Sequence, residues 1–413
     1  MKLERLAVTG LGIVNGLGHD IESSWQRLLN NESAIKDFEW PDIEDHVFRE
    51  YRANCPVKVG AGLTVPECPR PEWEKEWRNL DQSIRCAVHA SDQALKSSGL
   101  TTKNIAVIFG SIGSQHTRTE GVDRMVKGKT KFPPRKTLNF EPGHLGAIIS
   151  RLFGLRGSSY IIYSACSTGL HAIDSAQRLL TTDPTLDAVL IGSGDCPLEE
   201  NSAFYFSNLG ALSTRTAKDA CRPFDQDRSG FILGEAGTAM VLQRAKDVTT
   251  TPFGYVNSVG AVTIPEHETS PDAEGEAATL AATRALELAE LEAKDIGYIN
   301  AHATGTQVGD IIEYNAMLKL FPNTIMTANK GHLGHSIAGA GFAESIYTIL
   351  ALRDQVTPPV AKLENPCGKG MILPREKMPI DTQYAIKNNY AFGGRSLSAI
   401  FESPWDKQLQ NQK

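Results

Sequence analysis

The chain has 413 residues, 41% of them hydrophobic and 22% charged, and a formal net charge of −6. This composition is typical of a folded globular protein that is long enough for one large two-part domain. The mild negative charge argues against general nucleic-acid binding, and the lack of a run of about 18 apolar residues argues against a membrane-spanning helix.

The seven cysteines are scattered along the chain and lack CxxC spacing. They indicate free thiols in a reducing compartment, not a disulfide framework or a zinc site. The N-terminus enters strand-like sequence directly, without the apolar core of a signal peptide. We therefore expect a cytoplasmic protein.

The first elements alternate between buried strands and helices. Residues 6–16 predict a strand and a glycine-rich turn, and Asn15 replaces the third glycine of a dinucleotide-binding fingerprint, which favours a plain tight turn. Residues 38–80 are rich in charge, proline and tryptophan and lack periodicity, so we expect a surface excursion with short helices. Helical spacing follows in residues 81–98, and residues 105–110 are typical of a buried strand.

A basic segment occupies residues 127–136, with Lys127, Lys129 and Lys131 in its first half. Such a run is either a solvated loop or a docking surface for an acidic partner. The sequence leaves both interpretations open.

Residues 160–165 form a strand-like run that ends at Cys166, and helical spacing begins at Leu170. Cys166 is therefore expected at or near a helix N-terminus, where the helix dipole and free backbone N–H groups lower the pKa of a thiol. The small residues after it leave room for a substrate carbonyl. A buried cysteine that packs as a small hydrophobic side chain is the alternative.

The second half of the chain repeats the plan of the first. Its apolar patterns predict a strand and two helices, at residues 296–301, 308–320 and 334–352. Two halves of similar plan indicate an internally duplicated, layered α/β fold. We place the halves at residues 1–247 and 248–413.

Two further turns carry histidines next to glycines, at residues 300–313 and 329–341. A single histidine is usually a structural residue, since one hydrogen-bond partner is enough to bury it. Together with the turn that carries Cys166, these two turns make three with a reactive side chain, which favours a functional site. A metal bound by His302, His332 and His335 is an alternative, but the spacing lacks the usual ligand signatures, so we expect no metal.

Five segments together resemble the elongating β-ketoacyl-[acyl-carrier-protein] synthases of the thiolase superfamily, in family order and from about residue 5 to residue 402. They are YSACSTG (163–169), CRPFDQDRSGFILGEAG (221–237), NAHATGTQVGDIIE (300–313), KGHLGHSIAGAG (330–341) and NNYAFGG (388–394). The resemblance implies two pseudo-symmetric halves in a five-layered αβαβα stack, normally dimeric. It also implies a decarboxylating Claisen condensation between an acyl group on Cys166 and malonyl-carrier protein, which gives a 3-oxoacyl product.

The resemblance also implies roles for individual residues. His302 and His335 would stabilise the enolate, and Lys330 and Glu313 would form an ion pair that orients them. Thr304 and Thr306 would hold the phosphopantetheine arm. Phe392 would gate the cysteine, and its backbone N–H would form an oxyanion hole with that of Cys166. No cofactor would be bound permanently, because the carrier protein supplies the arm. The expected partners are that carrier protein, which the basic segment would dock, and a second subunit, either an identical copy or a chain-length factor.

Two departures from the family pattern bear on function. Arg395 and Ser396 stand where the family usually has threonine and asparagine after the FGG turn, so the hydrogen bonding of the gate loop cannot be carried over. We therefore favour a type II polyketide or polyene pathway over fatty-acid synthesis. The alternatives are a non-catalytic chain-length partner, which typically lacks the cysteine, and a thiolase, which expects a second cysteine near residues 388–396.

Overall fold

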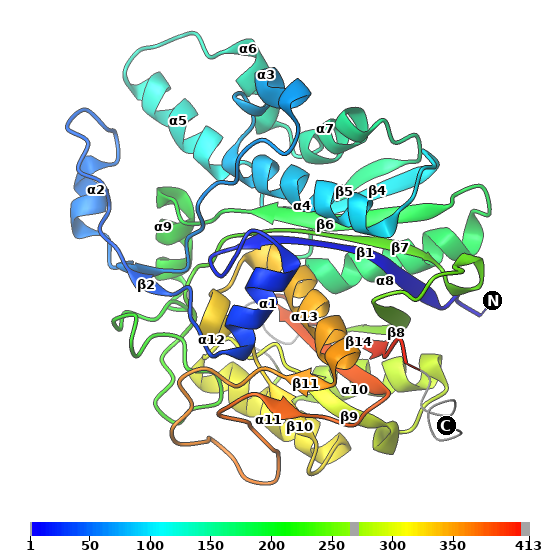
Figure 1. Ribbon diagram of the computed structural model, residues 1–413. Helices are drawn as coiled ribbons and strands as arrows, with labels where there is room; N and C mark the ends of the chain where they lie inside the picture. Colours follow the sequence, from blue (N-terminus) through cyan, green and yellow to red (C-terminus); the bar gives the residue numbers. More distant parts are fainter. Residues whose placement is uncertain (1, 265–271, 406–413) are drawn as a thin grey trace.

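The computed structural model describes residues 2–264 and 272–405, and its two halves have the same strand order (Figure 1). The order is β1-β7-β6-β4-β5 in the first half and β8-β14-β13-β9-β10 in the second. In both halves the first three strands are antiparallel and the last pairs parallel. The first half consists of β1 (Leu6–Asn15), β4 (Ile105–Gly110), β5 (Ser159–Ile162), β6 (Ala188–Asp195) and β7 (Ala236–Arg244). The second consists of β8 (Gly254–Thr263), β9 (Ile296–Asn300), β10 (Ile325–Thr327), β13 (Tyr384–Ala391) and β14 (Arg395–Glu402).

The halves join where the first three residues of β1 pair with Gly254–Val256 of β8, which makes the ten strands continuous. Two helices, α8 (Thr168–Thr182) and α13 (Ala340–Asp354), lie between the halves and contact strands of both. On the outside, α4 (Gln82–Ser98) and α7 (His144–Phe153) cover the first half, and α10 (Glu276–Ala289) and α11 (Gln307–Leu320) cover the second. This is the predicted five-layered duplicated fold.

Burial explains the sequence patterns of the central elements. All ten residues of β1 and all eight of β6 are buried, because helices cover both faces of the sheet, and such strands read as continuous apolar runs. Helix α13 is buried all round from Ala340 to Leu352. Its first turn touches α8: a Cβ at Gly169 would lie 2.6 Å from the backbone of Gly341. Glycine at this point therefore sets how closely the two helices approach.

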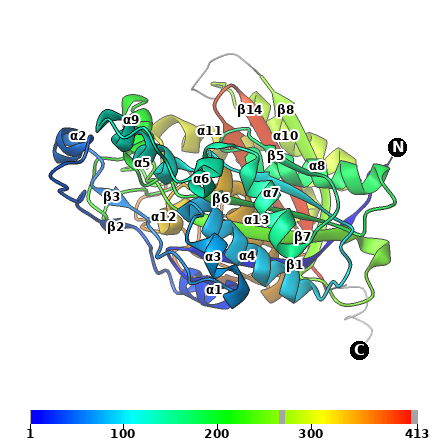
Figure 2. The ribbon, with the colours of Figure 1, turned by 90° about the horizontal axis from the view of Figure 1, so that it is seen from above.

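The remaining elements are short or lie at the periphery (Figure 2). They are α1 (Ile21–Leu29), β2 (Lys36–Asp37), α2 (Arg49–Asn54), β3 (Val59–Gly60), α3 (Glu74–Trp77), α5 (Gln115–Val126), α6 (Pro134–Thr137), α9 (Glu200–Asn208), α12 (Lys330–Leu333), β11 (Val356–Thr357) and β12 (Met378–Pro379). Short 3₁₀ turns occur at Pro71–Trp73, Leu138–Phe140, Ala245–Asp247, Ala293–Asp295 and Ile337–Gly339.

Two predictions need correction. The helix predicted at residues 334–352 begins only at Ala340, because Gly334 takes a left-handed φ of 67° that ends α12 and a 3₁₀ turn follows. The segment 38–80 has the expected short helices, but it is not wholly on the surface: Trp73 and Trp77 are buried in a core cluster with Phe153. Within the described residues, no helix is long and apolar enough to cross a membrane.

Candidate active site

Cys166 lies in the tight turn between β5 and α8, two residues before the helix begins, as predicted. Ala165 has a left-handed φ of 47°. Side chains close the turn: the Ser167 hydroxyl donates to the carbonyl of Ser164 at 2.8 Å, and the Thr168 hydroxyl donates to that of Ala165 at 2.6 Å. The turn therefore holds the thiol in a fixed position at the end of the helix.

The Cys166 thiol contacts His335 across the interface between the two halves. The Sγ atom is 3.0 Å from Nε2 of His335. The backbone N–H of Ile337 donates to Nδ1 of the same ring at 3.2 Å, so the proton of the neutral imidazole sits on Nε2. His335 therefore points an N–H donor at the sulfur.

His302, at the end of β9, is oriented in the same way. Its Nδ1 lies 3.3 Å from both the Lys330 ammonium and the Asn389 amide nitrogen, which are donors. This again leaves the ring proton on Nε2. The rings of His302 and His335 lie 5.7 Å apart, centroid to centroid, and nearly perpendicular. Two neutral imidazole donors thus flank one small space beside Cys166.

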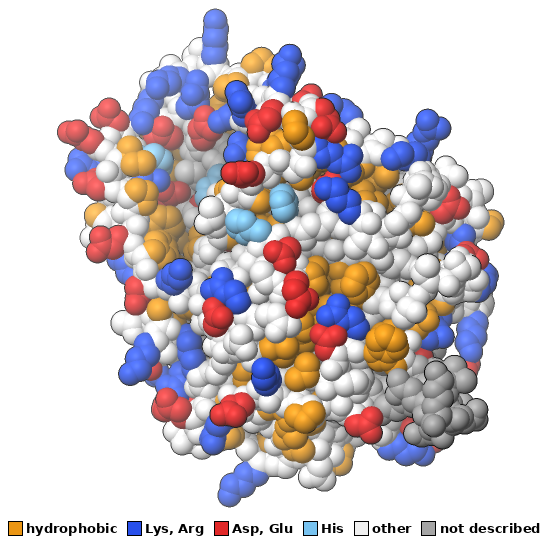
Figure 3. All heavy atoms as spheres, viewed as in Figure 1, with side chains coloured by type: hydrophobic (Ala, Val, Ile, Leu, Met, Phe, Trp, Pro, Cys, Tyr) orange, Lys and Arg blue, Asp and Glu red, His pale blue; other side chains and the backbone are white. Residues whose placement is uncertain are grey.

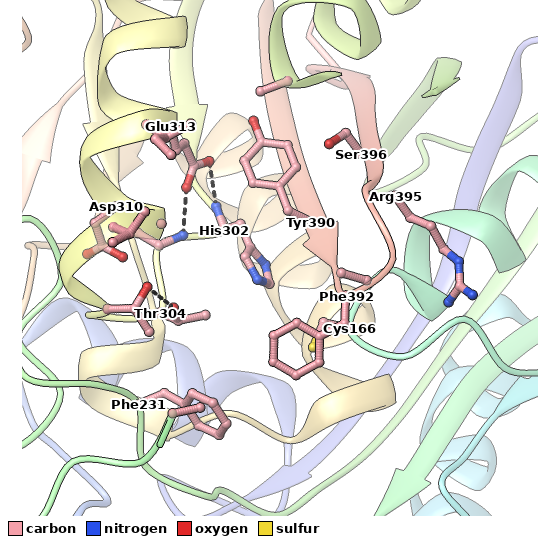
Figure 4. Close-up of a pocket in the computed structure, with 18 of the residues that line it drawn as sticks. Cys166, Phe231, His302, Thr304, Asp310, Glu313, Tyr390, Phe392, Arg395 and Ser396 are labelled. Carbon is pink, nitrogen blue, oxygen red and sulfur yellow. Dashed lines mark hydrogen bonds between the residues drawn. The ribbon is translucent and has the colours of Figure 1, made fainter. Parts of the chain in front are cut away.

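The predicted ion pair between Lys330 and Glu313 is wrong. Lys330 pairs with Glu344 at 2.5 Å, and Lys387 pairs with the other oxygen of the same carboxylate at 2.9 Å. Glu313 instead accepts the backbone N–H groups of His302 and Ala303, each at 2.8 Å (Figure 4). It faces the end of β9 from α11, so it positions the His302 backbone without neutralising a lysine.

The three members of this charge cluster, Lys330, Glu344 and Lys387, are at most 2% exposed. Burial lowers the pKa of Lys387 to about 8. Sequence reasoning missed Glu344, Lys387 and Asn389. The lysine inside the buried strand β13 and the glutamate inside the apolar helix α13 were the available signals, since a buried charge needs a partner.

Burial dominates the protonation of the reacting groups. It lowers the pKa of both His302 and His335 well below the usual value, and the nearby Lys330 ammonium adds to the effect. Burial also raises the pKa of the Cys166 thiol to about 12, although Lys330 opposes the shift. The expected lowering of this pKa by the helix N-terminus is therefore wrong, because desolvation outweighs it. The resting site holds a thiol and two neutral imidazoles.

A cavity of about 270 Å³ opens in front of these groups (Figure 4). Its wall includes Cys166, His302, His335 and four predicted binding or positioning residues: Thr304, Thr306, Phe392 and Glu313. The Thr304 hydroxyl donates to that of Thr306 at 3.1 Å. The structure thus brings most of the predicted site residues to one cavity, and Lys330 lies directly behind it.

Phe392 lies in the turn between β13 and β14, where Gly393 and Gly394 both have left-handed φ values of 81° and 70°. Arg395 and Ser396 follow as the first residues of β14 and also line the cavity. Figure 4 shows the Arg395 guanidinium turned away from His302 and Glu313. The two departures from the family pattern thus lie on the wall of the cavity beside Phe392, the predicted gate residue.

The basic segment lies away from this cavity. Lys127, Lys129 and Lys131 are exposed on the loop that follows α5, where Lys and Arg side chains gather at the top of Figure 3. Lys127 is paired with Asp123 at 2.9 Å, whereas the structure gives Lys129 and Lys131 no ion pair among the described residues.

His332 does not join the other two histidines. Its ring is buried and its Nε2 lies 2.9 Å from the side-chain oxygen of Asn31. Throughout the described residues, no group of three or more His, Cys, Asp and Glu side chains is placed to hold a metal ion.

Comparison with known proteins agrees with this geometry. Residues 3–248 match the family model "Beta-ketoacyl synthase, N-terminal domain" and residues 254–364 match "Beta-ketoacyl synthase, C-terminal domain". The 3-oxoacyl-[acyl-carrier-protein] synthase 2 of Vibrio harveyi is 32% identical over 97% of this chain and 99% of its own.

Two solved structures share the fold. A β-ketoacyl synthase from Burkholderia phymatum has a TM-score of 0.84 at 26% identity, covering 97% of this chain and 99% of that one. A ketosynthase (ApeO) in complex with its chain length factor (ApeC), from Xenorhabdus doucetiae, has a TM-score of 0.82 at 24% identity, covering 97% and 98%. With both family models matched along most of its length, the chain belongs to the β-ketoacyl synthase family.

Proposed function

We propose that the protein is a catalytic β-ketoacyl-[acyl-carrier-protein] synthase, an acyltransferase that extends an acyl chain by two carbons. The observation that carries the proposal is the 3.0 Å contact between Cys166 Sγ and an Nε2 donor of His335, with His302 beside it on the same cavity. A non-catalytic chain-length partner has no use for this arrangement. The turn at residues 388–396 contains no cysteine, which argues against a thiolase.

In the first step Cys166 accepts the acyl group. Its thiol attacks the carbonyl carbon of an acyl thioester: a new S–C bond forms, the C–S bond to the phosphopantetheine arm breaks, and the Cys166 proton passes to the departing sulfur, which leaves as the arm's thiol. The backbone N–H groups of Cys166 and Phe392 stabilise the oxyanion of the intermediate. Covalent capture divides one difficult transfer into two easier ones.

In the second step malonyl-carrier protein loses CO₂. The electron pair of the broken C–C bond forms an enolate, whose oxygen accepts hydrogen bonds from Nε2–H of His302 and His335. The enolate carbon then attacks the acyl carbonyl, the new C–C bond forms, and Cys166 leaves as the thiolate. Neutral donors suit this step because their pKa values are low enough to keep both rings uncharged.

The partners and pathway form part of the same proposal. Thr304 and Thr306 bind the phosphopantetheine arm, which a carrier protein brings, so the chain needs no permanently bound cofactor. The second subunit covers β5, an edge strand that contains the exposed Tyr160 and is followed directly by the exposed Tyr163. Seven free cysteines support a cytoplasmic location. The altered residues Arg395 and Ser396 favour a polyketide or polyene substrate.

Acylation of Cys166 tests the proposal. The wild-type protein, incubated with octanoyl-carrier protein, should gain the mass of one octanoyl group on the Cys166 peptide. Cys166→Ala should gain none, and the matched control Cys367→Ala, which removes a cysteine outside the cavity, should load like the wild type. A wild-type protein that stays unmodified with carrier-bound chains of several lengths would sink the proposal.

Carrier-protein docking has its own test. Lys129→Glu with Lys131→Glu should weaken binding of an acidic carrier protein at low salt, where charge attraction is least screened. Lys369→Glu, an exposed lysine outside the basic segment, serves as the control. Equal affinity of both variants and the wild type would remove the basic segment from the docking surface.

A further inference from the structure

Strand β13 contains a lysine, Lys387, whose side chain is 0% exposed. The strand lies between β9 and β14 in the sheet of the second half, and Lys387 stands opposite Asn300, the last residue of β9. A lysine is almost never fully buried unless its charge is paired. Neither step of the proposed condensation uses this ammonium group, so its place in the core needs another reason.

The contacts of Lys387 lead to the backbone that carries His302. Its Nζ donates to the carbonyl of Ala301 at 3.4 Å and pairs with Oε2 of Glu344 at 2.9 Å. Lys330 has a matching arrangement, because it donates to the carbonyl of His302 at 2.5 Å and pairs with Oε1 of Glu344 at 2.5 Å. Two ammonium groups on one carboxylate thus hold consecutive carbonyls at the end of β9.

The same ammonium group also holds the strand that contacts the His302 ring. Its Nζ donates to the carbonyl of Asn388, in the peptide unit that leads to Asn389. The Asn389 amide nitrogen lies 3.3 Å from Nδ1 of His302. Because side chains alternate along a strand, Lys387 and Asn389 share the face of β13 that meets α13. Lys387 therefore connects the two segments that orient His302, one through its backbone and one through its ring.

Lys387 also adds a positive charge next to the histidine pair, His302 and His335. Besides these rings, the groups that face its ammonium are Glu344 from α13, Lys330 from α12 and Glu313 from α11. Burial lowers the pKa of Lys387 to about 8, although Glu344 opposes the shift. A buried positive charge favours the negative charge that develops on an enolate oxygen bound by the two imidazoles.

We propose that Lys387 is a positioning residue for the condensation, which holds the segment that carries His302 and supplies a buried positive charge behind the enolate. The inference rests on the proposed function, because it needs the decarboxylation step. Lys387 does not line the cavity, so it acts through His302 and through its charge. A displacement of about 1 Å in a reacting group can cost about a hundredfold in rate.

The first test separates the two half-reactions. Lys387→Met should slow CO₂ release from malonyl-carrier protein by about ten- to a hundredfold. Acylation of Cys166 by octanoyl-carrier protein should stay close to the wild-type rate, since backbone N–H groups stabilise its intermediate. Lys387→Gln, whose amide still donates to a carbonyl, should recover part of the CO₂ release. Lys362→Met is the matched control and should keep both rates, because this lysine also donates to backbone carbonyls, those of Ala217 and Ala220 at 2.7 Å each, without contacting the histidine pair.

The pH profile gives a readout that a merely structural role would not move. The pKa of Lys387 in the folded protein is lowered to about 8, so its charge is present below that pH and is lost as the pH rises through it. CO₂ release by the wild type should therefore fall above about pH 8, and this fall should be missing in Lys387→Met. Acylation of Cys166 in the same samples should not fall, because the thiolate fraction rises with pH.

Three results would overturn the inference while leaving the proposed function intact. They are unchanged CO₂ release in Lys387→Met, an equal slowing of CO₂ release and acylation, and a fall above about pH 8 that persists in Lys387→Met. If Lys387→Met does not fold, as judged by urea denaturation, Lys387→Gln and the wild-type pH profile decide between the same results.

Nuclear magnetic resonance of protein with isotope-labelled histidine separates the inference from the proposed function. The His302 signal, identified by its loss in His302→Asn, should show a proton on Nε2 in the wild type. Lys387→Met should shift or broaden this signal, and Lys362→Met should not. A wild type that releases no CO₂ but shows this response would refute the proposed function and support the positioning role. An identical His302 signal in the wild type and Lys387→Met would overturn the inference.

Discussion

The two halves contain the same strand, turn and helix, but the turns differ. In the first half residues 163–167 connect β5 to α8 in a short turn, and that turn carries Cys166. In the second half residues 328–339 connect β10 to α13, and this longer connection makes room for α12, a 3₁₀ turn, Lys330 and His335. The duplicated fold therefore supplies the common geometry, and the two unequal turns supply the Cys166 thiol and the His335 imidazole that meet in the cavity.

The contact between the two central helices brings the turns together. Gly169 stands in the first turn of α8, and its backbone approaches that of Gly341 in α13 too closely for a side chain. This close approach lets Sγ of Cys166 meet the His335 ring.

The largest loss of stability is expected from changes to the buried charge cluster of the second half, Lys330, Glu344 and Lys387. Glu344→Gln leaves the buried ammonium groups of Lys330 and Lys387 without their shared carboxylate. We expect a loss of about 3–5 kcal/mol of unfolding free energy, measured by urea denaturation. Lys387→Met is the control and should cost less, because Glu344 keeps its pair with Lys330. Equal losses in the two variants would mean that the cluster does not depend on its carboxylate.

A smaller loss of unfolding free energy is expected from a change at the contact between α8 of the first half and α13 of the second. Gly169→Ala would force a methyl group against the backbone of Gly341, so we expect a loss of about 1–3 kcal/mol. Acylation of Cys166 should slow as well, because the helices must separate. Gly143→Ala is the control, since no atom lies within 4 Å of its added Cβ. If both variants unfold at the same urea concentration, the helix contact does not set the geometry.

The third prediction compares two opposing influences on the pKa of the Cys166 thiol. The N-terminus of α8 lowers this pKa, and burial against the second half raises it. With a thiol pKa raised to about 12, the thiolate fraction rises tenfold per pH unit below that value. Alkylation of the Cys166 peptide by iodoacetamide should therefore accelerate about tenfold per unit between about pH 7 and pH 9 without levelling off. The same peptide in urea-unfolded protein should level off near the ordinary thiol pKa of about 8.5. A plateau at or below that pH in the folded protein would show that the helix end, not burial, controls the thiol.

Local patterns predicted the strands and turns of the duplicated fold well. Strands that are buried on both faces read as apolar runs, and glycine-rich turns are recognisable from their composition. Cys166, His302 and His335 stood in such turns. The partner of Lys330 was missed because Glu344 lies inside α13, where no periodicity singles it out and only its spatial neighbours give it a role. The burial of Trp73 was missed for the same reason, since its partner Phe153 belongs to another element. The direction of the thiol pKa shift depends on desolvation, which arises only from the assembled halves.

The split of the site between halves also governs the order in which it can form during synthesis. Cys166 and His335 are 169 residues apart, so at about 5–20 residues per second roughly 10–30 s pass between their emergence from the ribosome. The β1 edge that β8 covers stays open only for the first part of that interval, because β8 (Gly254–Thr263) precedes His335 in the chain, whereas the Cys166 thiol lacks its His335 partner throughout. The nascent chain thus carries an unpaired strand edge until β8 is made, and a Cys166 thiol without its histidine partner until residue 335 follows.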